Sequence, residues 1–233
     1  MYDIKKKGQT LAYKLMDPFI KVLIKLGITP DMITFFGFVL TIFSTGVLIY
    51  GGEVGDRTNH RFMGYAGFII LVAGAMDMVD GRLARLSSKA HPAGALYDSV
   101  LDRYSELVMF FGYCYYTVAQ GYFLTSIFCF IAMIGSIMVS YTRARAEGLG
   151  VNASVGLMQR PERILLVALS SILLTIISGK IGGDFVYTSE ILDQPLFETI
   201  SIFSWPITFL AISANITALR RLSYAKKKLN EKY

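Results

Sequence analysis

The sequence predicts an all-α integral membrane protein, with six transmembrane helices preceded by an amphipathic helix at the membrane interface. Hydrophobic residues make up 54% of the 233-residue chain. They are gathered in long apolar blocks separated by short charged loops, which is typical of a protein in a bilayer. Lysines and arginines are concentrated in alternate loops, as expected for helices that cross a membrane back and forth. The whole chain, residues 1–233, is predicted to form one membrane domain.

The first predicted element is a helix from about Leu11 to Leu26. Its apolar residues recur on one side at helical spacing, and lysines occupy the other side. A helix divided in this way lies on the membrane surface, where its lysines contact anionic headgroups. Residues 1–27 are therefore predicted to form a juxtamembrane amphipathic segment. The apolar side consists of Leu11, Leu15, Phe19, Val22, Leu23 and Leu26.

Six apolar stretches follow, each near the roughly 20 residues that cross the hydrocarbon core of a bilayer. No strand-like alternation indicates a closed barrel, so each stretch is predicted to be a helix. The stretches are Met32–Tyr50, Phe62–Val79, Gly94–Ala119, Tyr122–Tyr141, Ile164–Ser178 with an extension back to Arg160, and Phe197–Leu219. They form a predicted six-helix bundle at residues 28–222, followed by a basic tail at 223–233. The connection at about 179–196 is predicted to be irregular and exposed.

The placement of positive charge predicts the orientation of these helices. Of the 23 lysines and arginines, only Arg57, Arg61 and Lys180 fall on one side of the predicted membrane. The others lie on the side of the two termini. Because cytoplasmic loops carry the excess of positive charge, both termini are predicted to be cytoplasmic. The protein is expected to be a multi-pass protein of the cell (inner) membrane.

Four carboxylates lie within or beside the second and third apolar stretches: Asp77, Asp80, Asp98 and Asp102. Each ionised carboxylate at the centre of a membrane helix costs roughly 2.5–3.5 kcal/mol, so the four are expected to converge on positive charge. Asp77 and Asp80 are three residues apart and share one helix face. Asp98 and Asp102 are four residues apart and share a face of the next helix.

Two glycines and an arginine accompany these carboxylates. Gly81 lets the backbone approach a ligand, Gly94 leaves space beside the second pair, and Arg85 carries a planar fork of donors suited to phosphate. Hard oxygen ligands at such a site indicate Mg²⁺, with Mn²⁺ and Ca²⁺ as alternatives. Two other interpretations are salt bridges from arginines such as Arg82 and Arg103 and the proton relay of a transporter.

The spacing of these residues is Asp77-x₂-Asp80-Gly81-x₂-Ala84-Arg85-x₈-Gly94-x₃-Asp98-x₃-Asp102. It resembles the signature of the CDP-alcohol phosphotransferase family at all eight fixed positions. The six predicted spans are similar to the family architecture, so the resemblance covers most of the chain. It implies an Mg²⁺-dependent membrane enzyme that transfers a phosphatidyl group from CDP-diacylglycerol to a hydroxyl of a polar acceptor and releases CMP. It also implies a homodimer among membrane lipids, with no nucleic acid partner, and an active site facing the cytoplasm.

The resemblance implies roles for the matched positions. Asp102 resembles the general base that takes the acceptor proton. The implied metal ligands are Asp77, Asp80, Asp98 and Asp102. The implied nucleotide-binding residues are Asp77, Gly81, Ala84 and Arg85 of the motif, with Pro30, Asp31 and Thr34 of a Thr29-Pro30-Asp31-x₂-Thr34 stretch similar to the family's TPN-x-x-T segment. Asp31 stands where the family more often has Asn, and Thr29 or Asp31 would equally suit a helix N-cap.

A basic cluster around the fourth connection bears on the identity of the acceptor. Arg143, Arg145 and Glu147 end one predicted helix, and an Arg160-Pro161-Glu162-Arg163 stretch begins the next. So many arginines favour a phosphorylated acceptor. The two stretches resemble the phosphatidylinositol phosphate synthase branch of the family, which implies inositol 1-phosphate as the acceptor. The residues implied in binding its phosphate are Arg143, Arg160, Arg163 and, in the last helix, Arg220.

Two alternatives remain at this stage. Glycerol 3-phosphate is also phosphorylated, so the chain could be a phosphatidylglycerophosphate synthase. A non-catalytic membrane carrier with an ion site would also place carboxylates inside membrane helices. The complete eight-position motif favours an enzyme over the carrier.

Overall fold

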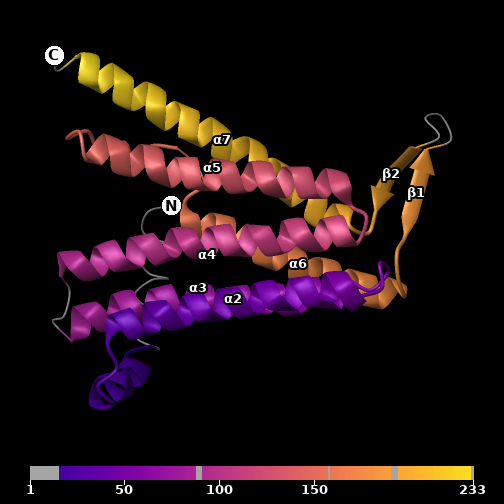
Figure 1. Cartoon of the computed structure of the whole chain (residues 1–233), viewed down its shortest axis with the longest axis horizontal. Helices are drawn as coiled ribbons and strands as arrows, with labels where there is room; N and C mark the ends of the chain where they lie inside the picture. The colour runs from indigo at the N-terminus through magenta and orange to yellow at the C-terminus, as the bar shows by residue number, and fades with distance from the viewer. Residues whose placement is uncertain (1–15, 88–90, 157, 190–193, 232–233) are drawn as a thin grey trace. The chain divides into compact units, whose positions relative to one another are not determined.

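The computed structural model describes residues 16–87, 91–156, 158–189 and 194–231, and most of them lie in long helices (Figure 1). The elements are α2 (Pro30–Val54), α3 (Arg61–Leu86), α4 (Pro92–Ala119), α5 (Phe123–Glu147), α6 (Arg160–Ile181), β1 (Val186–Ser189), β2 (Gln194–Glu198) and α7 (Ser201–Asn230). The chain forms two compact units. The first unit is made of Met1–Leu40 and Val72–Tyr104, and the second of Thr41–Leu71 and Ser105–Tyr233.

Five of the described helices, α2, α3, α5, α6 and α7, are long and apolar enough to cross a membrane. The chain is therefore a multi-pass membrane protein. The predicted third span corresponds to α4, which is 28 residues long but does not meet the same test of composition. Four charged residues lie in its first half or directly after it: Asp98, Asp102, Arg103 and Glu106.

The predicted irregular connection at 179–196 is wrong in part, because it contains most of a β-hairpin (Figure 1). Strands β1 and β2 pair antiparallel, with Val186 opposite Glu198, and the register shifts between Tyr187 and Thr188. Val186, Tyr187 and Thr188 are residue types that favour strands. Because Phe197 lies in β2, the last helix begins at Ser201 instead of at Phe197.

The last helix also extends further than predicted. α7 continues to Asn230, so the predicted basic tail at 223–233 begins inside the helix. Ala225 is buried against Val151 and Ala153 of the α5–α6 connection. This apolar contact stabilises the end of α7 as a helix. The basic composition of residues 223–233 alone does not reveal the contact.

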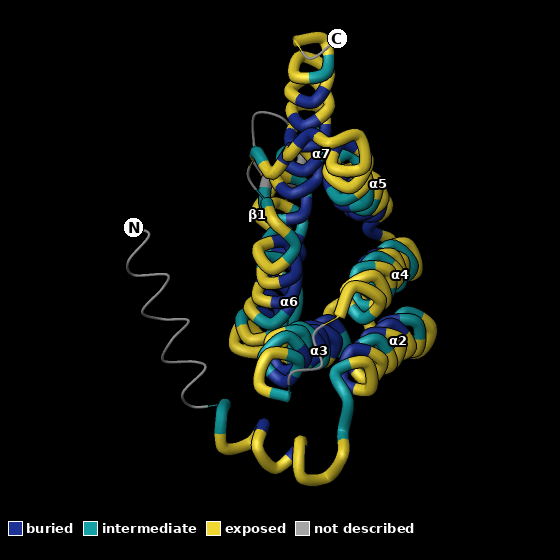
Figure 2. Tube along the Cα trace, turned by 90° about the vertical axis from the view of Figure 1, so that its left-hand side faces the viewer, coloured by how far each residue is buried: buried dark blue, intermediate teal, exposed yellow. Residues whose placement is uncertain are grey.

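Helices α5 and α7 of the second unit lie side by side and run in the same direction (Figure 1). At their first turns, Thr125 Oγ1 and Ser204 Oγ are 2.7 Å apart. Further along, a Cβ at Gly135 would lie 2.9 Å from the Cβ of Ala214. Near their last turns, Arg221 of α7 donates to the carbonyl of Val139 in α5. Buried and exposed residues alternate along α7 (Figure 2), as expected for a helix packed on one side.

The other helices of the second unit pack through small residues and buried hydroxyls. Gly64 of α3 lies against Thr175 of α6, where a Cβ would come within 2.7 Å of the threonine Cβ. Ser171 of α6 donates to the phenol oxygen of Tyr113 in α4 at 2.7 Å. The buried core of this unit is built around these contacts, with Tyr113 stacked on Phe203 at 5.0 Å.

The described part of the predicted N-terminal helix is helical at residues 16–25, and residues 11–15 lie outside the described residues. Ile20 and Leu23 are buried against Val79 and Leu83 of α3 in the first unit. Three residues of the predicted apolar side are exposed, namely Phe19, Val22 and Leu26. The segment therefore uses part of its apolar surface for packing on the protein and leaves part exposed.

Candidate functional site

The first unit brings the predicted Thr-Pro-Asp stretch to the aspartate motif. Pro30 occupies the first position of α2, where its missing N–H costs no hydrogen bond. Thr29 Oγ1 accepts the N–H of Met32 at 3.3 Å, so Thr29 is the N-cap of α2. Thr34, one turn later, donates its hydroxyl to Asp80 Oδ2 at 2.7 Å. Asp31 is therefore not needed as the helix cap.

Asp80 is the most enclosed carboxylate of the motif. Its residue is only 6% exposed, and the Thr34 hydroxyl fixes one of its oxygens. Asp77 and Asp98 are half-buried and lie close enough to interact electrostatically with Asp80. The structure thus brings three of the four predicted metal ligands into one neighbourhood, as the sequence spacing predicts.

The chemistry of this donor set fits a divalent cation. Converging carboxylates repel one another, and hard oxygen donors are the ligands that Mg²⁺, Mn²⁺ and Ca²⁺ prefer. In the part of the chain that the structure describes, no group of three or more His, Cys, Asp or Glu side chains is already arranged to hold a metal. The carboxylates are near one another but do not form a closed coordination cage.

The glycines of the motif are placed against other motif residues. A Cβ at Gly81 would lie 3.8 Å from Arg85 Nη2, so the guanidinium extends over the glycine. At Gly94, a Cβ would be 3.4 Å from Asp31 Oδ1 and 3.3 Å from a ring carbon of His91. Asp31 therefore faces the start of α4, and both glycines leave space beside polar side chains.

The remaining predicted residues of the first unit are partly accessible. Ala84 and Asp102 are half-buried, and Arg85 is exposed. Asp102 lies on α4 one turn after Asp98, as the spacing predicts. These positions are compatible with contact to a ligand.

Two arginines considered as partners of the aspartates have contacts outside the motif. Arg82 forms a two-point ion pair with Asp17, at 2.8 and 2.9 Å. Hydrogen bonding to Arg82 lowers the pKa of Asp17, against the opposing effect of desolvation. Arg103 donates to both the carbonyl and the hydroxyl oxygen of Ser99 on its own helix. The described contacts of these two arginines are therefore with Asp17 and Ser99.

The second unit contains a buried ion pair that the sequence did not predict. Arg163 and Glu106 have side chains that are each only 1% exposed. Arg163 donates to both carboxylate oxygens of Glu106, at 2.7 to 3.0 Å, and to the carbonyl of Met158 at 2.8 Å. Glu106 lies four residues after Asp102, so continuing the four-residue spacing of the motif could have identified it. As placed, Arg163 is enclosed and is not open to a soluble acceptor.

The other predicted acceptor arginines differ in exposure. Arg143 is half-exposed and pairs with Glu147 at 2.8 Å, Arg160 is half-buried at the start of α6, and Arg220 is exposed. Arg221, which was not predicted, is buried and interacts electrostatically with Arg143 and with Arg163.

Backbone contacts hold this unpredicted arginine in place. Arg221 donates to the carbonyls of Val155 and Val139, both at 2.8 Å. The structure therefore favours Arg221 over Arg220 as the α7 member of the basic cluster. Adjacent residues on a helix point about 100° apart, so without the packing of α7 the sequence could not distinguish the two.

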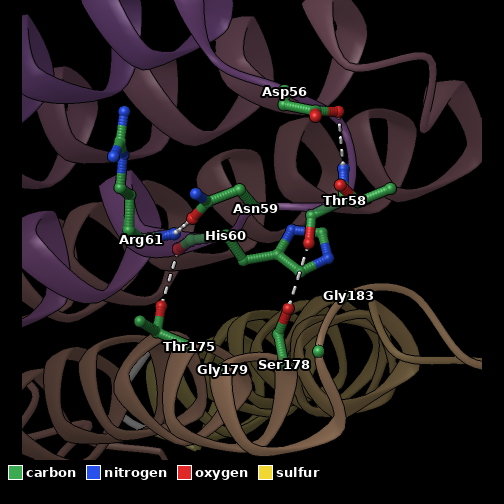
Figure 3. Close-up of a pocket in the computed structure, with 10 residues that line it drawn as sticks. Asp56, Thr58, Asn59, His60, Arg61, Thr175, Ser178, Gly179 and Gly183 are labelled. Atoms are coloured by element: carbon green, nitrogen blue, oxygen red, sulfur yellow. Dashed lines mark hydrogen bonds between the residues drawn. The ribbon is translucent and has the colours of Figure 1, made fainter.

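A second polar region of the same unit lies between the C-terminal end of α6 and the α2–α3 connection (Figure 3). It forms a pocket of about 320 Å³. His60 is buried, and its Nε2 lies 3.1 Å from Asp184 Oδ1. Ser178 donates to the carbonyl of Thr58 at 3.2 Å, and Thr175 to that of His60 at 2.6 Å. These contacts tie the α2–α3 connection to the segment that follows α6.

Comparisons with known proteins agree on one family. The sequence profile of a family described as CDP-alcohol phosphatidyltransferase matches residues 27–217. The archaetidylinositol phosphate synthase of Pyrococcus horikoshii is 31% identical over 210 residues, covering 90% of this chain and 89% of that protein. The phosphatidylinositol phosphate synthase of Mycobacteroides abscessus is 33% identical over 161 residues, covering 68% of this chain and 69% of that protein.

Solved structures share the fold. The crystal structure of Mycobacterium tuberculosis phosphatidylinositol phosphate synthase with CDP-DAG bound has a TM-score of 0.72 and 22% identity, covering 91% of this chain and 94% of that one. The same synthase in complex with manganese and citrate has a TM-score of 0.71 and 23% identity, covering 89% and 87%. At this level of identity the likeness concerns the fold.

Proposed function

Because the chain belongs to the CDP-alcohol phosphatidyltransferase family, and is an enzyme of that family, we propose that it transfers the phosphatidyl group of CDP-diacylglycerol to inositol 1-phosphate and releases CMP. The observation that carries this proposal is the complete aspartate motif, folded with Asp80 buried against Thr34 and with two further carboxylates beside it. The two relatives, whose names both contain inositol phosphate, support the acceptor.

The metal in this proposal is held by Asp77, Asp80, Asp98 and Asp102. Mg²⁺ is the proposed ion, and the manganese-bound synthase of the same fold supports a divalent cation. When bound, such an ion neutralises diphosphate charge and stabilises the leaving group. Thr34 fixes one oxygen of Asp80 by its hydrogen bond, which keeps that carboxylate oriented before a ligand arrives.

The chain's own residues position the nucleotide. Arg85 is exposed and extends over Gly81, where no side chain blocks access. Its planar donor fork suits a diphosphate. Pro30, Asp31 and Ala84 complete the proposed nucleotide site, with Asp31 placed beside Gly94.

Asp102 is the proposed general base. Its carboxylate takes the proton from the acceptor hydroxyl, and the oxygen then forms a bond to the phosphorus that carries the lipid. The bond between that phosphorus and the CMP oxygen breaks, and CMP leaves with the electron pair. No covalent intermediate on the protein is required.

The acceptor phosphate is assigned in this proposal to the basic cluster of the second unit. Arg143 is the accessible member, and Arg160 and Arg220 are predicted members that are not enclosed. Arg221 adds positive charge from a buried position, whereas the charge of Arg163 is paired with that of Glu106. Arg163 would have to leave Glu106 and Met158, which use its donors, to bind the phosphate itself.

The cellular setting follows from the same proposal. The protein is proposed to lie in the cell (inner) membrane with six spans, both termini and the active site on the cytoplasmic side, and to form a homodimer. The five membrane-length helices and the excess of Lys and Arg on one predicted side support this arrangement.

The test is CMP release by the purified protein with CDP-diacylglycerol and Mg²⁺. Inositol 1-phosphate, glycerol 3-phosphate, free inositol and serine are compared as acceptors. The proposal requires release with inositol 1-phosphate and little with free inositol. Release with glycerol 3-phosphate alone would keep the mechanism and replace the acceptor. No release with any acceptor would refute the proposed reaction.

A further inference from the structure

A cavity of about 640 Å³ lies where α5 and α7 begin, within the second unit. The first turns of both helices line it, and the contact between Thr125 and Ser204 holds these turns together. None of its lining residues belongs to the aspartate motif or to the arginine cluster near Arg163. The cavity therefore requires an explanation other than the proposed reaction.

The cation in this cavity is Arg57, and its position is fixed by a chain of buried contacts. The guanidinium carbon lies 4.7 Å from the centre of the Tyr122 ring. Tyr122 donates its hydroxyl to Asp184 Oδ2 at 2.8 Å, and the other oxygen of Asp184 is 3.1 Å from the buried His60. Arg57 also interacts with the Tyr122 hydroxyl and with the carboxylates of Glu198 and Asp184, and its side chain remains partly exposed.

The one carboxylate near Arg57 in the cavity lining is held loosely. The distance between Arg57 Nη2 and Glu198 Oε2 is 3.8 Å, which is too long for a hydrogen bond. The Arg57 side chain is 54% exposed. An anion that reached the cavity could therefore replace a long ion pair with shorter, charge-assisted hydrogen bonds.

The N-terminus of α5 adds N–H donors to the cavity, whereas the second and third N–H groups of α7 are bonded to the carbonyls of Thr199 and Ile200. In the described structure neither the residue before α5, Tyr122, nor the residue before α7, Ile200, provides a side-chain cap. The first N–H groups of a helix and its dipole favour an anion. Arg57 and the N-terminus of α5 supply the donors of this cavity, and Glu198 and Asp184 are the carboxylates that interact with Arg57.

The rim of the cavity is apolar and open. Phe123, Leu124 and Trp205 line it and are 68%, 66% and 64% exposed. α5 and α7 are membrane-length helices, so their ends lie where headgroups meet hydrocarbon. Aromatic residues favour this level of the bilayer. The cavity thus joins the half-exposed Arg57 to a surface suited to acyl chains.

We propose that this cavity binds a membrane phospholipid, with its phosphate at Arg57 and the N-terminus of α5, and its chains along Phe123, Leu124 and Trp205. The site is separate from the binding of CDP-diacylglycerol as substrate. A phosphate can accept hydrogen bonds from both Arg57 and the first N–H groups of α5. The bound lipid would fill the space between the ends of α5 and α7.

Trp205 gives a direct measurement, because it is the only tryptophan of the chain. The full-length protein in detergent is titrated with phosphatidylglycerol carrying brominated chains, which quench tryptophan fluorescence on contact. Brominated diacylglycerol, which has the same chains and no phosphate, is titrated in parallel. The variants are R57Q and, as a matched control, R61Q, which removes a nearby arginine that does not line this cavity.

The proposal expects saturable quenching by the phospholipid at lower concentration than by diacylglycerol. R57Q should raise the half-quenching concentration about tenfold, the usual value of a lost charged hydrogen bond, whereas R61Q should not change it. Unaltered CMP release would verify that R57Q folds. Equal quenching by diacylglycerol, or equal titrations for R57Q and the unmodified protein, would overturn the proposal. An equal rise of the half-quenching concentration in R61Q would also overturn the proposal.

Discussion

At the scale of single residues, the hydroxyl of Thr34 and the carboxylate of Asp80 show how the motif is prepared for a ligand. The two residues are 46 positions apart, on α2 and α3, and their 2.7 Å hydrogen bond is buried. A buried carboxylate with like charges nearby is unfavourable unless hydrogen bonds or a cation compensate it. Thr34 supplies one hydrogen bond to Asp80. A divalent cation would supply the positive charge that compensates the carboxylates.

Replacing Thr34 with Val should weaken the proposed metal site, because Val keeps the shape but removes the hydrogen bond to Asp80. Loss of a group that orients a metal ligand typically costs about 10- to 100-fold in metal affinity or activity. The measurement is CMP release as a function of Mg²⁺ concentration. Thr34→Ser, which keeps the hydroxyl, is the control and should stay close to the unmodified protein. An unchanged Mg²⁺ dependence in Thr34→Val would contradict this role.

Replacing Asp102 with Asn should abolish most turnover, since an amide cannot accept the proton of the acceptor. General bases typically contribute about 10²- to 10⁴-fold to rate. CMP release measures the loss, and binding of CDP-diacylglycerol should be largely retained, because Asp77, Asp80 and Asp98 remain to hold the metal. Turnover that survives in Asp102→Asn would show that another group takes the proton.

Site residues could be predicted where the sequence pattern lies within one helix. They could not be predicted where a residue contacts a partner far away in the sequence. The spacing of Asp77 and Asp80 within one helix predicts their shared face, and the structure agrees. The pairing of Glu106 with Arg163 joins residues 57 positions apart, so it depends on how α4 and α6 pack. The choice of Arg221 over Arg220 likewise depends on the packing of α7 and not on the residue type.

At the scale of elements, buried ion pairs and small residues connect the helices. The helix starts were mostly close to prediction because apolar runs mark them, but α3 and α5 continue to Leu86 and Glu147, past the predicted ends at Val79 and Tyr141, since their last turns carry charged residues. The hairpin of β1 and β2 and the extended end of α7 were missed, since short strands and a charged helix end carry weak sequence signals. The Glu106–Arg163 pair is the strongest test of element packing, because both side chains are enclosed.

Replacing Glu106 with Ala should lower the free energy of unfolding by about 3–5 kcal/mol, the cost of leaving one partner of a buried ion pair uncompensated. Thermal denaturation in detergent measures the change. The control is Glu147→Ala, which removes a half-exposed partner of Arg143 at a similar distance and should cost about 1 kcal/mol or less. Equal effects of the two substitutions would mean that burial of the Glu106 pair does not matter to stability.

The packing of residues 16–25 on α3 should weaken in acid, because Asp17 must be ionised to pair with Arg82. The pKa of Asp17 is lowered in the folded protein, so its contribution is full above the ordinary value near 4 and is lost as the pH falls through the folded value. Hydrogen exchange of residues 16–25, corrected for the intrinsic pH dependence of exchange, should show protection at pH 6 that falls below about pH 4. Asp17→Asn should remove this pH dependence. Loss of protection already between pH 7 and pH 5 would contradict the assignment.

At the scale of the whole molecule, the contact between His60 and Asp184 bears on the number of membrane crossings. His60 precedes α3 and Asp184 follows α6, and their side chains are 3.1 Å apart, so the two segments belong to one side of the membrane. Four crossings between them, by α3, α4, α5 and α6, return the chain to the same side. Three crossings, without α4, would place them on opposite sides.

Labelling of single cysteines tests whether α4 crosses the membrane. After replacement of Cys114 and Cys129, cysteines are introduced at Asn59, Thr188 and Ser154 in separate variants, and whole cells are treated with an impermeant maleimide. With six spans, Asn59 and Thr188 share one side and should both be labelled from outside, whereas Ser154 should be labelled only after lysis. If α4 does not cross, Asn59 and Thr188 lie on opposite sides and Ser154 becomes accessible with Asn59. The contact of His60 with Asp184 predicts the first result, because two side chains in contact cannot lie on opposite sides of about 30 Å of hydrocarbon.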